Sequence, residues 1–316
     1  MKKIDLSIII VNYNTKDYIK ECLYSIFSNT DDARIEVIVV DNNSHDNSVE
    51  MIKKEFSQVK LIANSDNVGF GQANNQGVRT SEGRYLLLLN PDTKILPKSL
   101  NILYQFMETH PKVGIAAPML LNDDLSLQRS CRAFPGLWRE FSKALGFFTY
   151  MPSHPLFGSS TASRWDHDKI QAVDQPQGAC LMIRRDVLED KDIFDRRFYM
   201  YYEEVDLCYR IKKKNWQIYF VPDAKIIHYA GKSFSKNMPR MIYHLYKSKF
   251  LFYKKHYNIF KQSMLYFLTL LEMVYRITIF SLIGLIYIER KKEVSLRRQG
   301  YLRVLLSFSL GRLPNR

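Results

Sequence analysis

Short apolar segments alternate with segments of helical spacing through residues 7–89, and this alternation limits the fold more than any other feature of the chain. The apolar segments have the composition of buried strands and cover Ser7–Val11, Ile35–Val40, Val59–Ala63 and Tyr85–Leu89. The intervening segments place apolar residues three or four positions apart, which predicts helices over Asp17–Phe27, Ser48–Phe56 and from the Asn67–Gly71 segment to Thr80. Strands that alternate with helices in this way build a mostly parallel sheet with helices on both faces. We therefore expect an α/β fold of the Rossmann-like kind.

The pattern is looser after residue 90. Its spacing predicts helices over Pro97–Thr109 and Glu203–Lys214, the start of a short helix at Asp186–Leu188, and strands over Val113–Met119, Gly178–Arg184, Ile218–Val221 and Ala224–His228. Residues 122–174 carry prolines and scattered aromatic residues with little periodicity. A connection of that length inside a compact domain usually serves a function.

Polar clusters follow the predicted parallel strands. They are Asn12-Tyr13-Asn14, Asp41-Asn42-Asn43-Ser44, Asn67-Val68-Gly69-Phe70-Gly71 and Asn90-Pro91-Asp92. Taken one at a time, each is more simply explained as a turn or a helix cap. Together they matter more, because ligands of open α/β sheets bind at the carboxyl ends of the strands.

A second group of titratable residues lies late in the chain. Glu203, Glu204 and Asp206 follow two tyrosines at the predicted start of a helix, and His228 ends a predicted strand. Acids at a helix start also complement the helix dipole, and a lone histidine is usually structural. Crowded carboxylates nevertheless raise one another's pKa, which suits a general base. His228 becomes a candidate metal ligand only if Asp92 lies beside it.

The order of these motifs resembles that of the family 2 inverting glycosyltransferases, which have a GT-A fold. The resemblance covers roughly residues 4–235 and also includes Gly178-Ala179, Phe194-Asp195 and His228-Tyr229-Ala230-Gly231. It looks closest to the bacterial rhamnosyltransferases, in which Asn-Pro-Asp occupies the position of the DxD motif. The chain departs from the strict pattern at Asn90, the first position of that triplet, and at Glu204, where the family usually has Asp.

The resemblance implies a metal-dependent, inverting transfer of a sugar, with rhamnose as one candidate, from a nucleoside diphosphate sugar to a hydroxyl group of a glycan or a polyprenyl-diphosphate-linked saccharide, in the synthesis of a cell-surface polysaccharide. The residues it implies for donor binding are Tyr13, Asp41, Asn42, Gly69, Asn90 and Asp92. Asp92 and His228 would hold Mg²⁺ or Mn²⁺. Glu204 is implied as the catalytic base, with Asp206 as the rival candidate.

The positive charge of the chain is concentrated at its end. The formal net charge is +14, and residues 230–316 contain 17 Lys and Arg but only three acids, Glu272, Glu289 and Glu293. A neutral body with a basic end predicts an anionic partner, either a nucleic acid or an anionic membrane surface. We predict a catalytic domain over residues 1–235 and a helical, membrane-associating extension over residues 236–316.

The extension contains an apolar stretch, Ser263–Ile288, that is interrupted by Glu272 and Arg276 at a spacing that lets them pair on one helix face. Its length suits a membrane span, but two charges near the middle oppose one. Basic residues on both sides favour a helix lying on an anionic membrane surface. Packing against the rest of the protein, or across a homodimer, stays open as an alternative.

Two other functions are weighed here. A basic nucleic-acid-binding protein would account for the charge, yet the basic residues are interleaved with long aliphatic runs and no nucleic-acid-binding signature is present. A nucleotidyltransferase would need a Gly-rich basic phosphate loop, and Val11–Lys16 is not one. The four cysteines are widely spaced, which predicts free thiols and a cytoplasmic location. Together with the basic, apolar extension, this predicts an enzyme that is peripheral on the inner face of the cell membrane.

Overall fold

The computed structural model describes residues 4–29, 34–147, 151, 154, 165–190, 192–229, 238–286 and 291–309. These residues form two compact units. Unit 1 comprises residues 1–134, 165–199 and 203–230, and unit 2 comprises residues 135–164, 200–202 and 231–316. The predicted division of the chain at residue 235 into a catalytic domain and an extension stays a prediction.

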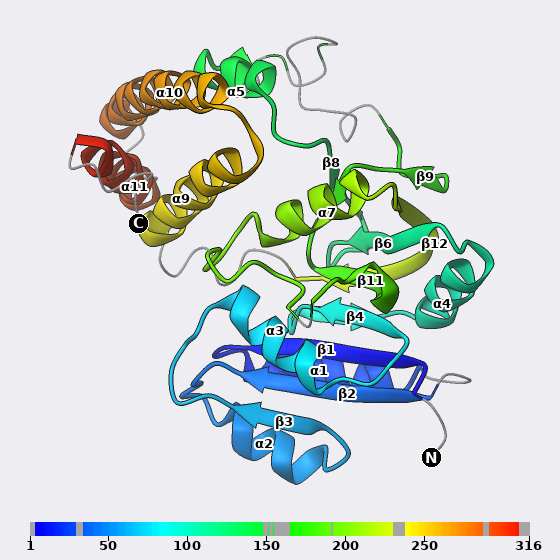
Figure 1. The fold of residues 1–316 in the computed structure, drawn as a ribbon. Helices are drawn as coiled ribbons and strands as arrows, with labels where there is room; N and C mark the ends of the chain where they lie inside the picture. The colour runs from blue at the N-terminus through cyan, green and yellow to red at the C-terminus, as the bar shows by residue number, and fades with distance from the viewer. Residues whose placement is uncertain are drawn as a thin grey trace. The chain divides into compact units, whose positions relative to one another are not determined.

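Unit 1 is built on one large mixed sheet (Figure 1). Its strands follow the order β3-β2-β1-β4-β11-β6-β12-β5, with bounds β1 Leu6–Asn12, β2 Ile35–Asp41, β3 Lys60–Ala63, β4 Tyr85–Leu89, β5 Thr93–Ile95, β6 Val113–Leu121, β11 Cys180–Arg184 and β12 Gln217–His228. The first four strands run parallel, and β6 and β12 are parallel to each other. The strand β11 is antiparallel to both of its neighbours. The expected mostly parallel sheet is confirmed.

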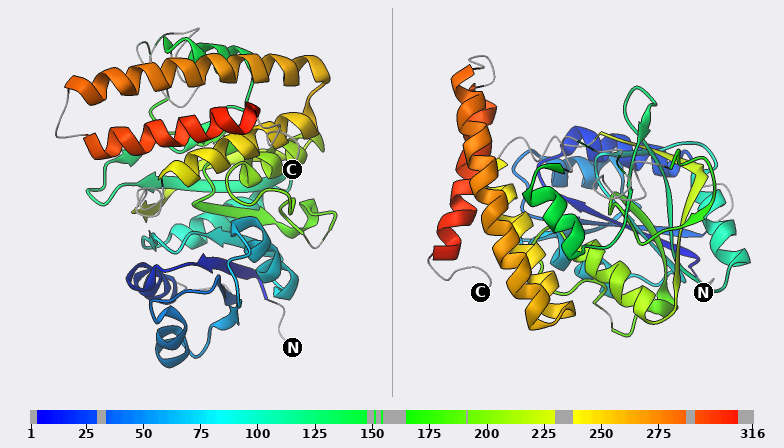
Figure 2. Two further views of the ribbon diagram at one scale, coloured as in Figure 1. Left: turned by 90° about the vertical axis from the view of Figure 1, so that its left-hand side faces the viewer. Right: turned by 90° about the horizontal axis from the view of Figure 1, so that it is seen from above.

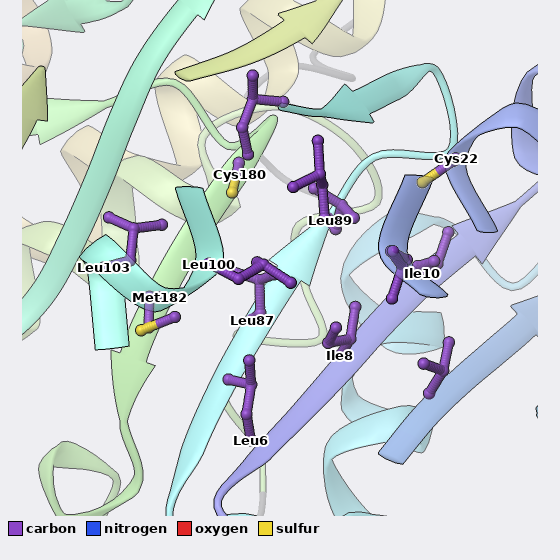
Figure 3. Close-up of a cluster of buried hydrophobic side chains, with 14 of the residues drawn as sticks. Leu6, Ile8, Ile10, Cys22, Leu87, Leu89, Leu100, Leu103, Cys180 and Met182 are labelled. Atoms are coloured by element: carbon purple, nitrogen blue, oxygen red, sulfur yellow. The ribbon is translucent and has the colours of Figure 1, made fainter. Parts of the chain in front are cut away.

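Helices cover both faces of this sheet, which explains why its strands are apolar on both sides. Successive residues of β1 point to opposite faces, so Ile8 and Ile10 join one core and Ile9 joins the other. The first core is closed by α1 (Lys16–Phe27), α2 (Ser48–Glu55) and α4 (Ser99–Thr109). Figure 3 shows this core around Ile8, Ile10 and Leu87. The other face is covered by α3 (Phe70–Thr80) and α7 (Glu203–Lys213).

The predicted elements of unit 1 are present, with three differences in detail. The short helix expected at Asp186–Leu188 is a single 3₁₀ turn, Arg185–Val187. The two strands expected over residues 218–228 are one strand, β12, with an irregularity between Val221 and Lys225. Short strands that the periodicity did not predict are β5, β7 (Leu127–Gln128), β8 (Cys131–Arg132), β9 (Gln171–Ala172) and β10 (Gln175–Pro176).

Unit 2 is helical and contains α5 (Leu137–Ala144), α9 (Met238–His256), α10 (Ile259–Ile286) and α11 (Lys291–Ser309). The helix α11 packs against both α9 and α10, and α5 packs against α10 (Figure 2). Gly300 lets α11 approach α9, because a Cβ atom there would lie 2.7 Å from Cδ1 of Ile242. Among the described residues one helix, Ile259–Gly284, is long and apolar enough to cross a membrane, and 22% of its apolar window is buried.

Candidate active site

The ends of β1 and β2 are joined by hydrogen bonds between polar side chains. The amide of Asn12 donates to Asp41 Oδ1 at 2.6 Å, and the backbone N–H of Ser44 donates to Asp41 Oδ2 at 2.8 Å. Asn42 donates to the carbonyl of Gly69 at 3.4 Å. Asp41 and Asn42 are buried, whereas Tyr13, at the end of the same strand pair, is 47% exposed. Of the three residues predicted to contact base and ribose, Tyr13 is therefore the one whose side chain is open to a ligand.

Gly69 begins the glycine-rich segment with a left-handed backbone, at φ 88°. A Cβ atom at this position would lie 2.8 Å from both the carbonyl oxygen and the ring of Tyr199. The backbone N–H of Phe70 donates to the same carbonyl at 3.2 Å. The glycine is thus required both by the backbone conformation and by close packing against Tyr199.

The end of β4 is held against β11 and β12. The backbone N–H of Asn90 donates to the carbonyl of Ala179 at 2.9 Å, and that of Tyr229 donates to the carbonyl of Asp92 at 3.0 Å. The antiparallel pairing of β5 with β12 places Thr93 opposite His228. These contacts bring Asp92 Oδ1 to 3.5 Å from His228 Nε2, so the proximity that the sequence analysis required of this pair is present.

The imidazole of His228 is oriented by Gln128, a residue that the sequence analysis missed. The amide nitrogen of Gln128 donates to the carbonyl of His228 at 3.2 Å and to Asn122 Oδ1 at 3.0 Å. Its oxygen therefore faces His228 Nδ1, at 2.7 Å, and accepts the proton of that nitrogen. Nε2 is left as an acceptor directed toward the carboxylate of Asp92. A histidine whose other ring nitrogen is bonded to a neighbouring oxygen, as Nδ1 is here, is typical of a metal site.

Two acceptors that face each other at this distance fit a divalent cation between a carboxylate and an imidazole. Among the residues that the structure describes, no group of three or more His, Cys, Asp and Glu lies close enough to hold a metal. Mg²⁺ sites in proteins commonly use one or two protein ligands together with substrate phosphates.

Glu203 and Glu204 begin α7, on the face of the sheet that α3 also covers. A Cβ atom on Gly178 would lie 3.4 Å from Cβ of Glu204, and one on Gly71 would lie 4.0 Å from Cβ of Glu203. Gly178 precedes Ala179, which bonds Asn90. The acidic pair therefore lies close to the end of β4, the start of β11 and the start of α3.

The two carboxyl groups have different surroundings. Burial raises the pKa of Glu203 well above its usual range, and the charge of Glu204 raises it further. Its Oε2 atom is buried without a hydrogen-bond partner among the described residues. Burial also raises the pKa of Glu204, while its backbone hydrogen bonds and the positive charge of Arg132 oppose that rise. Glu204 is partly exposed, so it is the member of the pair that an incoming group can reach.

Asp206 points elsewhere. Its side chain is fully buried and pairs with Arg210 at 2.8 Å, and Arg210 in turn donates to the carbonyl of Ile193 at 2.6 Å. Asp206 therefore helps to fix the position of α7. These contacts do not test the catalytic role predicted for Asp206, and that role stays a prediction.

The chain is similar to known glycosyltransferases. A model of the family described as "Glycosyl transferase family 2" matches residues 7–190. The chain is 26% identical over 262 residues to the N-acetylglucosaminyl-diphospho-decaprenol L-rhamnosyltransferase of Mycobacterium tuberculosis, covering 78% of this chain and 83% of that protein. It is 28% identical over 234 residues to the rhamnosyltransferase WbbL of Escherichia coli, covering 71% of this chain and 83% of WbbL.

A solved structure has a similar fold. The mannosyltransferase PcManGT from Pyrobaculum calidifontis, in complex with GDP-Man and Mn²⁺, matches 97% of this chain and 87% of its own length with a TM-score of 0.56. The sequence identity is 15%, so this likeness concerns the fold. It agrees with the expected GT-A architecture.

Proposed function

Because this chain belongs to glycosyl transferase family 2 and is a glycosyltransferase, we propose that it moves a sugar, with rhamnose as the leading candidate, from a nucleoside diphosphate to a hydroxyl group of a lipid-linked saccharide. The observation that carries the proposal is the bond from Asn90 to Ala179, which ties the strand end that bears Asp92 to the loop beside Glu204. The family match favours neither the nucleic-acid-binding nor the nucleotidyltransferase alternative.

We assign the donor nucleotide to the ends of β1, β2 and β4. Tyr13 offers an exposed aromatic ring for the base, and the buried pair Asp41 and Asn42 shapes the loops that surround the ribose. Gly69 and Asn90 would line the same pocket, with Gly69 adding no side chain there. The structural relative whose name includes GDP-Man supports a nucleotide sugar as the donor.

We assign Asp92 and His228 to a Mg²⁺ or Mn²⁺ ion, which when bound would neutralise negative charge on the departing diphosphate. Gln128 contributes by holding His228 in the tautomer that leaves Nε2 free. The structural relative with Mn²⁺ supports a divalent cation, and the residues present here fit one.

We assign Glu204 as the general base. Its carboxylate accepts the proton of the acceptor hydroxyl as that oxygen bonds to the anomeric carbon, and the bond from this carbon to the diphosphate oxygen breaks at the same time. One displacement from the opposite side inverts the configuration. The leaving group departs as an anion, so no acid is needed to protonate it, in contrast to glycoside hydrolysis. Burial raises the pKa of both carboxyl groups, most strongly that of Glu203, and the positive charge of Arg132 opposes the rise at Glu204.

The proposed acceptor is a saccharide on a polyprenyl diphosphate, and the proposed pathway is the assembly of a cell-surface polysaccharide. The support is the name of the M. tuberculosis relative, which includes a decaprenol diphosphate. Such an acceptor lies in a membrane, so we place the enzyme peripherally on the cytoplasmic face. The basic helices α9 to α11 are consistent with that location.

The decisive experiment is a transfer assay with a panel of nucleotide sugars, in which the released product is identified. Release of a nucleoside diphosphate supports the proposal, and release of pyrophosphate contradicts it. Glu204→Gln should lower kcat by about 10²–10⁴-fold while donor affinity stays unchanged, since only the proton acceptor is removed. Glu189→Gln, at an exposed carboxylate, is the matched control. A Glu204→Gln enzyme with normal turnover would refute the assignment of the base.

The metal assignment has its own test. Asp92→Asn should weaken the binding of nucleoside diphosphate measured by calorimetry in the presence of Mn²⁺, and should have little effect in its absence. Equal affinities of the variant and the wild type with Mn²⁺ would contradict the role given to Asp92.

A further inference from the structure

One side of α10 carries a continuous row of exposed side chains, most of them apolar. The row consists of Phe260, Ser263, Phe267, Leu271, Val274, Thr278 and Leu282. Successive members are three or four residues apart, so all of them lie on one face of the helix. The five large apolar members are between 39% and 65% exposed. We call this row the α10 stripe.

The opposite side of α10 faces the protein, and Glu272 and Arg276 lie there. Glu272 is 3% exposed and its Oε1 atom accepts from Arg276 at 2.8 Å. Its Oε2 atom lies 3.7 Å from Lys249 Nζ, on α9, and Lys249 donates to Glu140, on α5, at 2.8 Å. The two charges that interrupt the apolar stretch are therefore part of a buried ion network that links three helices of unit 2.

This network argues against a membrane span. If α10 crossed a bilayer, Arg276 would leave the hydroxyl of Tyr301, to which it donates at 3.4 Å, and Lys249 would lose Glu272, one of its two carboxylates. A span would also place Glu272 within the bilayer, whereas α10 holds Glu272 on its protein-packed side and the α10 stripe on its exposed side. One-sided exposure of this kind is typical of a helix that lies in the plane of a membrane interface.

Basic residues lie at both ends of the stripe. Lys261, which directly follows the first member in the sequence, is exposed, as are Lys254 near the end of α9 and Lys292 at the start of α11. On α9 and α11 the exposed cations also include Arg240, Arg298 and Arg303. Across the three helices the acids are Glu272, which is buried, and Glu293, which pairs with Arg297. An apolar row between cations matches an anionic lipid surface, while a second copy of the same face would bring like charges together.

We propose that unit 2 binds the surface of an anionic phospholipid bilayer with α10 parallel to the membrane plane and the α10 stripe immersed at the boundary between head groups and acyl chains. The proposal deepens the proposed function, because it rests on an acceptor carried by a membrane lipid. It names the face that would keep the enzyme where that acceptor is.

The test is flotation of the whole protein with vesicles of phosphatidylcholine alone or mixed with phosphatidylglycerol, at low and at high salt. We expect binding to the anionic vesicles that weakens at high salt, and release of the protein from these vesicles by alkaline carbonate. The double substitution Phe267→Glu with Leu271→Glu should lower the vesicle partition coefficient by about tenfold or more, because charges replace immersed apolar groups. The control is Leu125→Glu with Ile170→Glu, at two exposed apolar residues of unit 1, which changes the net charge by the same amount. This control variant should keep about half or more of the wild-type partition coefficient.

Three results would overturn the proposal. One is no binding of the wild type to anionic vesicles; another is equal loss of binding in the two double variants; the third is retention of the protein in the membrane after carbonate, which would indicate a span. If the wild type does not bind vesicles but forms a dimer, and the Phe267→Glu, Leu271→Glu variant is monomeric, the face belongs to a second copy of the chain.

Sugar transfer to a water-soluble acceptor tests the proposed function separately, since the stripe variant should retain this activity. Wild-type protein that floats but transfers no sugar would contradict the function and leave the membrane face standing.

Discussion

Replacing Lys249 by methionine is predicted to destabilise unit 2 strongly. Lys249 is 5% exposed, and its ammonium nitrogen lies 2.8 Å from Glu140, 3.7 Å from Glu272 and 4.3 Å from the ring centre of Tyr246. Methionine retains most of the length of the side chain and removes the charge, so packing changes little. Two buried carboxylates then lose a shared cation.

The cost follows from what remains around those carboxylates. Removing one partner of a buried ion pair costs about 3–5 kcal/mol. Glu140 keeps Lys143 at 3.4 Å, and Glu272 keeps Arg276 at 2.8 Å, so we expect the lower end of that range, about 3 kcal/mol. Glu140→Gln made on top of Lys249→Met removes an unpaired charge. The double variant should therefore be more stable than the sum of the single changes predicts, by about 1 kcal/mol or more.

The loss should also depend on pH. Burial works against ionisation of Glu140, but Lys143 and Lys249 prevail and lower its pKa from 4.5 to about 2. Because this folded-state pKa lies below the unfolded value, the stabilisation is present above pH 4.5 and is lost as the pH falls toward 2. In Lys249→Met the carboxyl group can take up a proton at a higher pH. The difference between variant and wild type should therefore shrink on acidification.

Hydrogen exchange followed by mass spectrometry measures this effect in unit 2 alone, through peptides from α9 and α10. Lys254→Met is the matched control, since Lys254 is an exposed lysine on the same helix. Equal protection in the two variants at neutral pH would refute the reasoning, because it would mean that the buried network contributes no more than a solvated lysine. A loss that does not change with pH would refute the part assigned to Glu140.

Three further predictions concern unit 1. Gly69→Ala should lower the free energy of unfolding by about 1 kcal/mol or more in thermal melts, because Gly69 has a positive φ and an added Cβ would lie 2.8 Å from Tyr199. Gly71→Ala should lower it less, because Gly71 has no positive φ and an added Cβ would lie 3.2 Å from the nearest atom, a carbonyl oxygen. Glu203→Gln should change kcat/KM by less than about tenfold and should not shift the acid limb of the pH–rate profile, because the amide imitates the protonated carboxyl group. A shift of that limb would show that Glu203 is ionised in the active enzyme. Glu36→Gln should lower the free energy of unfolding by about 1–3 kcal/mol at neutral pH, because buried Glu36 accepts hydrogen bonds from Ser7, Lys60 and a backbone N–H. The pKa of Glu36 is lowered, so the difference in stability between variant and wild type should narrow below pH 4.5. A difference that stays constant in pH-dependent melts would contradict this prediction.

The sequence by itself determined the parallel half of the sheet. The strands β1 to β4 were predicted within one or two residues, because a strand buried on both faces must be apolar throughout and its ends must turn polar. The same logic located Asp92 and Glu204 at element ends, since polar residues that interrupt such a pattern are confined to turns and helix starts. The pairing of Glu272 with Arg276 also followed from the sequence, because helix geometry places residues four apart on one side.

Only the tertiary structure decided which distant groups meet. Gln128 lies on a two-residue strand that has no periodicity to detect, and its contact with His228 depends on the neighbouring strands β6 and β12. The sequence alone does not show which apolar residues of α10 are buried. Packing against α5, α9 and α11 decides which of them are buried and which form the exposed stripe. The partners of Glu272 outside its own helix follow from the same packing. Local spacing determines which residues share a face of an element, whereas the face that is buried, and the charges it meets there, depend on contacts between segments far apart in the chain.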